Sequence, residues 1–163
     1  MKYTKEKYIW GMLRIGMGWI FIWAFLDKLF GLGFATAAGK SWLDGVSPTL
    51  GFLKFGASGP FESLYHSLAG NAIVDWLYML GLILIGVALF FGVGIRIAGY
   101  AGSVMMLLFW SVALPPEHNP FMDEHIVYIL VLLGLAYANA GAPLGLGQWW
   151  TGTKLVQRYP VLQ

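Results

Sequence analysis

Residues 76–114 read WLYMLGLILIGVALFFGVGIRIAGYAGSVMMLLFWSVAL, and this stretch decides the fold. Its only charged residue is Arg96, which lies in the glycine-rich segment GVGIRIAG. The apolar runs on either side, residues 76–94 and 97–114, each approach the roughly 20 residues that a helix needs to cross a bilayer core. We therefore predict two membrane-spanning helices joined by a tight hairpin, because glycine permits the sharp turn.

Two further apolar runs of similar length flank this pair, at residues 8–26 and 126–142. Of all 163 residues, 58% are hydrophobic and only 11% are charged, whereas about 25% of the residues in an average soluble domain are charged. The sequence thus predicts one all-α domain over residues 1–163, an integral membrane four-helix bundle.

The first apolar run could also be a signal peptide, since Ala35-Thr36-Ala37 resembles a signal-peptidase site after a basic start. However, the run is of spanning length, and Asp27 and Lys28 precede that site. A retained first helix is the better interpretation.

Orientation follows from the positive-inside rule, which counts Lys and Arg in the loops. The N-terminus, the hairpin and the C-terminal tail would share one side with Lys2, Lys5, Lys7, Arg14, Arg96, Lys154 and Arg158, leaving Lys28, Lys40 and Lys54 on the other. This imbalance predicts a multi-pass membrane protein with both termini in the cytoplasm. Arg14, inside the first run, is expected to snorkel to the inner headgroups.

Residues 31–70 form a long outer connection that is too aromatic for a solvated linker. Its rings belong to Phe34, Trp42, Phe52, Phe55, Phe61 and Tyr65. Because Gly and Pro divide the connection into short pieces, we expect short interfacial helices folded over the outer end of the bundle. Such a connection either closes the bundle or acts as a lid over a site, and both interpretations stay open.

Two classes of site are excluded by the sequence. The chain has no cysteine, which rules out disulfides, covalently attached haem c and cysteine-ligated iron–sulfur clusters within it. The segment GLGFATAAGKS looks like a phosphate-binding P-loop, but five residues rather than four separate Gly33 from Gly39. We expect no nucleotide site and no nucleic-acid partner.

Titratable residues concentrate in residues 114–126, LPPEHNPFMDEHI, the predicted outer loop before the fourth run. Asn119 and Pro120 suit the N-cap and first turn of the next helix, and Asp123 and Glu124 would complement its dipole. Helix capping alone could therefore explain both acids.

A second interpretation is a proton-handling site. His125 would meet Asp27, Lys28 and Asp75 if the first, second and fourth apolar runs pack together, and histidine exchanges protons near neutral pH. A metal site from His118, Asp123 and His125 is chemically possible, but its spacing matches no specific template. A redox or quinone site, a structural cluster and a metal site therefore remain alternatives.

Four segments resemble the DoxX/DoxD family, in particular its thiosulfate:quinone oxidoreductase membrane subunits: WAFLDKLFGLGF, AGKSWLDG, GVGIRIAGYAG and LPPEHNPFMDEHIVYILVLLGLA. The resemblance implies oxidation of thiosulfate to tetrathionate on the outer side, with electrons passed to membrane quinone. It also implies a DoxA-like partner subunit. The matching positions are Trp23, Asp27, Lys28, Lys40, Trp42, Asp75, Arg96, Asn119, Asp123 and His125, whereas His118 stands where many relatives have asparagine.

Placement and resemblance together suggest roles for these residues. The expected catalytic residues, which would manage the protons of the quinone, are His125, Asp123, Asp27 and Asp75. The expected substrate-binding residues are Lys28 and Lys40, which would attract the anionic substrate, and Trp23 and Trp42, which would wall the pocket. Quinone is the expected electron acceptor, and no metal is assigned.

The alternative is a non-catalytic accessory subunit that binds membrane lipid and a larger respiratory complex through its apolar faces. Solute transport is a weaker interpretation, because no acid or base lies at the middle of a predicted span and no span is interrupted.

Overall fold

The computed structural model describes residues 3–116 and 119–163, and within those residues it contains helices and no strand. The longer helices are α1 (Lys5–Phe30), α3 (Ala72–Phe91), α4 (Ile95–Val112) and α5 (Glu124–Tyr137). The shorter ones are η1 (Phe52–Gly56), η2 (Gly59–Phe61), α2 (Glu62–Leu68), α6 (Gly147–Thr151), α7 (Lys154–Arg158) and η3 (Pro160–Leu162). The predicted all-helical class is therefore confirmed.

Within the described residues, α1, α3 and α4 are long and apolar enough to cross a membrane. Helix α5 has 14 residues, which gives about 21 Å against a hydrocarbon core of roughly 30 Å. The predicted end of the fourth span, near residue 142, is wrong. The helix ends at Tyr137, because Asn139 takes a left-handed φ of 46° and Pro143 cannot continue a helix.

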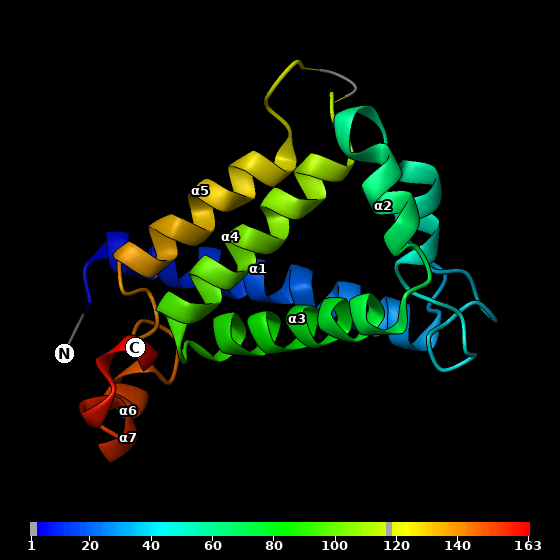
Figure 1. Ribbon diagram of the computed structural model, residues 1–163. Helices are drawn as coiled ribbons and strands as arrows, with labels where there is room; N and C mark the ends of the chain where they lie inside the picture. The colour runs from blue at the N-terminus through cyan, green and yellow to red at the C-terminus, as the bar shows by residue number, and fades with distance from the viewer. Residues whose placement is uncertain (1–2, 117–118) are drawn as a thin grey trace.

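The longer helices form two pairs. Helix α1 lies along α3, α4 lies along α5, and α3 also contacts α4 (Figure 1). The pairs meet at the end that carries both termini and spread apart toward the end where α2 lies (Figure 1). One hydrophobic core joins all four longer helices and includes Met17, Phe21, Met79, Leu82, Leu89, Ala98, Leu132 and Leu135.

Glycines bring α1 and α3 into close contact. A Cβ atom added at Gly18 would lie 2.6 Å from the backbone nitrogen of Phe90, and one added at Gly86 would lie 2.9 Å from that of Ile22. A larger residue at either position would separate the helices, because backbone atoms cannot move aside as side chains do.

Arg14 fastens α1 to the rest of the molecule. It is completely buried, and its guanidinium donates hydrogen bonds to the carbonyls of Leu89, Phe90 (2.7 Å), Pro143 (3.2 Å) and Leu144 (3.0 Å). The prediction that Arg14 snorkels to headgroups is wrong. The last carbonyls of α3 lack partners within their own helix and attract a cation, so they hold the side chain inside the protein.

The connection between α1 and α3 contains η1, η2 and α2 and is tied to the C-terminal end of α4. The Ser58 backbone nitrogen donates to the Val112 carbonyl at 3.0 Å. The Tyr65 hydroxyl lies 2.5 Å from the Ser111 hydroxyl. The connection thus bridges the two helix pairs where they spread apart, and its position at a membrane surface stays a prediction.

Candidate functional site

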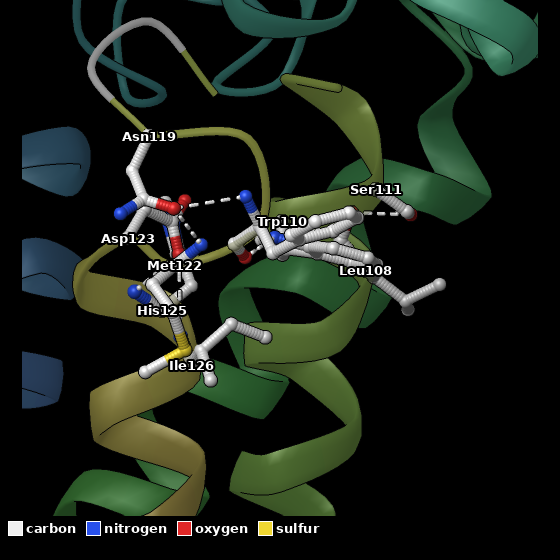
Figure 2. A network of polar contacts seen from close by, with 9 residues as sticks. Leu108, Trp110, Ser111, Asn119, Met122, Asp123, His125 and Ile126 are labelled. Atoms are coloured by element: carbon white, nitrogen blue, oxygen red, sulfur yellow. Dashed lines mark hydrogen bonds and ion pairs between the residues drawn. The ribbon is translucent and has the colours of Figure 1, made fainter. Parts of the chain in front are cut away.

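Asp123 caps the N-terminus of α5. Its Oδ1 accepts hydrogen bonds from the backbone nitrogens of His125 (3.0 Å) and Ile126 (3.3 Å) (Figure 2). Its Oδ2 lies 2.8 Å from His125 Nδ1. The predicted capping positions, Asn119 and Pro120, are wrong, since an N-cap must stand next to the free nitrogens of the first turn and Asp123 occupies that place.

Asn119 instead shapes the turn before α5. Its Oδ1 accepts hydrogen bonds from the backbone nitrogens of Phe121 and Met122, both at 3.0 Å (Figure 2). The indole nitrogen of Trp110 donates to the Phe121 carbonyl at 3.0 Å, which ties the turn to α4. An asparagine side chain that bonds the backbone two residues ahead is a common turn-stabilising arrangement. Glu117 and His118, in the same loop, lie outside the described residues.

The environment of Asp123 favours its charged form. Partial burial raises the pKa of the carboxyl, but hydrogen bonds from the His125 ring and from the backbone of Ile126 and His125 outweigh that effect and leave the pKa below its ordinary value. The side chains of His125 and Asp123 are 20% and 14% exposed. Asp123 is therefore an oriented carboxylate that holds one ring nitrogen of a half-buried histidine.

Together with Glu124, these two residues form a group of potential metal ligands. Ligand atoms of Asp123, Glu124 and His125 lie within 4.8 Å of one another. However, the Asp123 carboxylate already serves the helix cap and the imidazole. This grouping follows from capping and does not itself indicate a metal. The predicted metal alternative also required His118, which is outside the described residues.

Asp75, expected to be catalytic, anchors the connection to the start of α3. It is buried, and its Oδ1 accepts hydrogen bonds from the Ser47 hydroxyl (2.8 Å), the Thr49 hydroxyl (2.6 Å) and the Thr49 backbone nitrogen (3.3 Å). These bonds all hold the segment that leads into η1. The geometry gives Asp75 a positioning role.

Asp27, near the end of α1, has an incomplete set of partners. It is 2% exposed, and its Oδ1 accepts a hydrogen bond from the Phe34 backbone nitrogen at 3.2 Å. Its Oδ2 is buried without a hydrogen-bond partner among the described residues. Because burying an unpaired carboxylate oxygen is costly, this atom is a candidate for accepting a proton or a hydrogen bond from a ligand.

The other predicted residues lie in the connection or near the end of α1. Trp23 packs edge to face on Phe34, with ring centroids 5.1 Å apart, and Trp42 does so on Trp76 at 4.6 Å. Lys28 is half-buried, and Lys40 is exposed.

The predicted residues therefore fall into separate groups. Asp123 and His125 are paired at the start of α5, and Asp75 binds the connection at the start of α3. Within residues 3–116 and 119–163, no hydrogen bond or ion pair joins Asp123 or His125 to Asp27, Lys28 or Asp75. Their convergence in one pocket stays a prediction.

An apolar cavity that the sequence did not reveal lies between α3 and α4, beneath η1 and α2. Its volume is about 400 Å³, within the range of roughly 300–1,000 Å³ for small-molecule pockets. Its lining includes Phe52, Leu53, Tyr65, Leu77, Tyr78, Gly81, Ile85, Met105, Leu108 and Phe109, and none of the predicted site residues. The one feature of the sequence that could have indicated this cavity is the set of aromatic residues in the connection. One of them, Phe52, packs against Phe109 with ring centroids 5.7 Å apart.

Aromatic rings link this cavity to the histidine. Phe109 lies on the cavity wall, and its ring meets that of His125 edge to face, with centroids 6.0 Å apart. Tyr78 lies on the same wall, 5.8 Å from Phe109 between centroids. Among the described residues, the Tyr78 hydroxyl makes no hydrogen bond.

Comparison of the chain with protein-family models, with curated proteins and with solved structures finds no match.

Proposed function

We propose that this chain is the membrane subunit of an oxidoreductase that oxidises thiosulfate on the outer face of the prokaryotic cytoplasmic membrane and passes the electrons to quinone. The observation that supports the quinone part is the His125–Asp123 pair, which packs against Phe109, a residue that also lines an apolar cavity of about 400 Å³. The apolar walls suit an isoprenoid quinone, and the pair suits proton transfer. The thiosulfate part rests on the resemblance to the DoxX/DoxD family.

The chemistry requires a proton carrier. Two thiosulfate ions that join through a new S–S bond release two electrons, and a quinone that takes up two electrons also takes up two protons. Asp123 holds His125 Nδ1 at 2.8 Å, while Nε2 makes no hydrogen bond among the described residues. In this proposal Nε2 hands protons to the quinone and Asp123 orients the ring.

In the membrane, α5 completes a four-helix bundle with α1, α3 and α4, and both termini lie in the cytoplasm. Lys28 and Lys40 attract thiosulfate, with Trp23 and Trp42 beside them. Asp27 Oδ2, buried and unpaired, accepts a hydrogen bond at the same end of α1. A DoxA-like or other respiratory subunit completes the enzyme.

The test compares two histidine variants in the purified complex. His125→Gln should lower thiosulfate-dependent quinone reduction by roughly 10²-fold or more, because general acid–base groups contribute about that much. His66→Gln removes an exposed histidine of α2 and should keep full activity. Thermal unfolding of both variants shows whether the fold is intact. Full activity of a folded His125→Gln complex would reject the proton-carrier role.

The alternative, a non-catalytic accessory subunit, is favoured by one specific observation. The hydrogen bonds of Asp75 all fasten the connection, and those of Asp123 include the helix cap, as a purely structural cluster requires. Purification from native membranes distinguishes the two. A catalytic subunit should carry quinone and thiosulfate activity with its partner, whereas an accessory subunit should copurify with a complex whose activity survives its removal.

A further inference from the structure

A second cavity lies at the end of the molecule that carries both termini, between α4, α5 and η3. Its volume is about 410 Å³, and it is lined by Arg96, Ile97, Tyr100, Ala136, Tyr137 and Val161. Arg96 is the second residue of α4, whereas Phe109 is close to the other end of that helix. Arg96 and Phe109 are thus about 20 Å apart along the helix axis.

The polar side of this cavity is suited to an anion. Within the described residues, the Arg96 guanidinium makes no hydrogen bond or ion pair, although the Arg96 backbone nitrogen donates to the Gln163 carbonyl at 2.9 Å. Tyr100 and Tyr137 place their rings edge to face, with centroids 6.5 Å apart. No carboxylate side chain is among the lining residues. An unpaired guanidinium with phenolic hydroxyls nearby matches the bidentate recognition of phosphate.

The other side of the cavity is apolar, through Ile97, Ala136 and Val161. Arg96 lies at the end of an apolar helix long enough to span a membrane, which is the level of the lipid headgroups, and tyrosines are enriched there. A small soluble anion would use only the polar side. A phospholipid would use both sides, with its phosphate at Arg96 and its acyl chain along the apolar wall.

We propose that this cavity binds the phosphate headgroup of an anionic phospholipid. The site is independent of the proposed redox activity, and it requires only that the termini-bearing end of α4 reaches the headgroup region of either leaflet.

The experiment is native mass spectrometry of the full chain in detergent, with phosphatidylglycerol or phosphatidylcholine added. The wild-type protein should retain phosphatidylglycerol about tenfold more strongly than phosphatidylcholine, because both lipids carry a phosphate but the choline cation of phosphatidylcholine is repelled by Arg96. Arg96→Gln should lose that preference. Lys154→Gln removes one exposed positive charge from the same end of the molecule and should keep it. Equal loss in both variants would mean a general charge effect and would overturn the proposal.

A second variant guards against a folding defect in Arg96→Gln. Tyr137→Phe removes one hydroxyl from an exposed ring and should weaken phosphatidylglycerol binding by a few-fold. Unchanged binding in both Arg96→Gln and Tyr137→Phe would rule out the site. The last measurement adds inorganic phosphate at millimolar concentration as a competitor. If it displaces phosphatidylglycerol from the wild-type protein, the cavity takes free anions and the assignment to lipid is wrong.

Discussion

At the scale of single residues, Arg14 connects three parts of the molecule. Its side chain reaches four carbonyls from two segments that are distant in sequence, residues 89–90 and 143–144. Its two terminal nitrogens make these bonds, while Nε is buried without a partner among the described residues. Removing the side chain would leave buried carbonyls without donors, which is costly. Arg14 therefore stabilises the arrangement of α1, α3 and the segment after α5 together.

We predict that Arg14→Ala lowers the free energy of unfolding by roughly 3 kcal/mol or more, because it removes several hydrogen bonds made by one charged group. Arg14→Lys should lie in between, since an ammonium cannot reproduce the planar fork. Arg158→Ala, at an exposed position, should change stability by less than about 0.5 kcal/mol. Denaturant titration in detergent micelles measures all three. Similar midpoints for Arg14→Ala and Arg158→Ala would contradict the role.

At the scale of helices, the cap of α5 should respond to acid. The pKa of Asp123 is lowered in the folded protein, so its contribution to stability is present above the ordinary carboxyl pKa and is lost as the pH falls through the folded value. We predict faster hydrogen exchange at the amides of His125 and Ile126 below about pH 4. Asp123→Asn should remove this pH dependence while keeping a cap, and Asp123→Ala should cost about 1 kcal/mol. Identical acid responses in Asp123→Asn and wild type would exclude Asp123 as the cause.

Helices also show what the sequence could reveal and what it could not. The existence of α3 and α4 followed from unbroken apolar runs that meet at glycines, a local signal. The end of α5 did not, because residues 138–142 are mostly small and apolar, and the left-handed φ of Asn139 that ends the helix is not visible in such a run. At the candidate site, the pairing of Asp123 with His125 is local, two residues apart. The apolar cavity is assembled from η1, α2, α3 and α4, which no single stretch of sequence could indicate.

At the scale of the whole molecule, the testable property is its orientation in the membrane. We predict that a reporter active only in the cytoplasm works when fused to either terminus and fails when inserted beside Gly39, in the exposed part of the connection. The reason is the excess of Lys and Arg on the termini-bearing side. A reporter of the opposite kind provides the control and should give the reverse pattern. Activity of the cytoplasmic reporter at Gly39 would place the His125 site on the wrong side for the proposed oxidation.

The spreading of the two helix pairs, fastened at one end by Arg14, has a mechanical consequence. Rotation of one helix pair against the other would pivot about the buried carbonyls of residues 89–90 and 143–144, where Arg14 holds the pairs together. A small rotation barely moves atoms near this pivot, but the displacement of the helices grows with distance from it. The displacement is greatest where Tyr65 contacts Ser111 and Phe52 contacts Phe109. A change in bilayer thickness or lateral tension would therefore first change the distance between the two helix pairs at the end that η1 and α2 bridge.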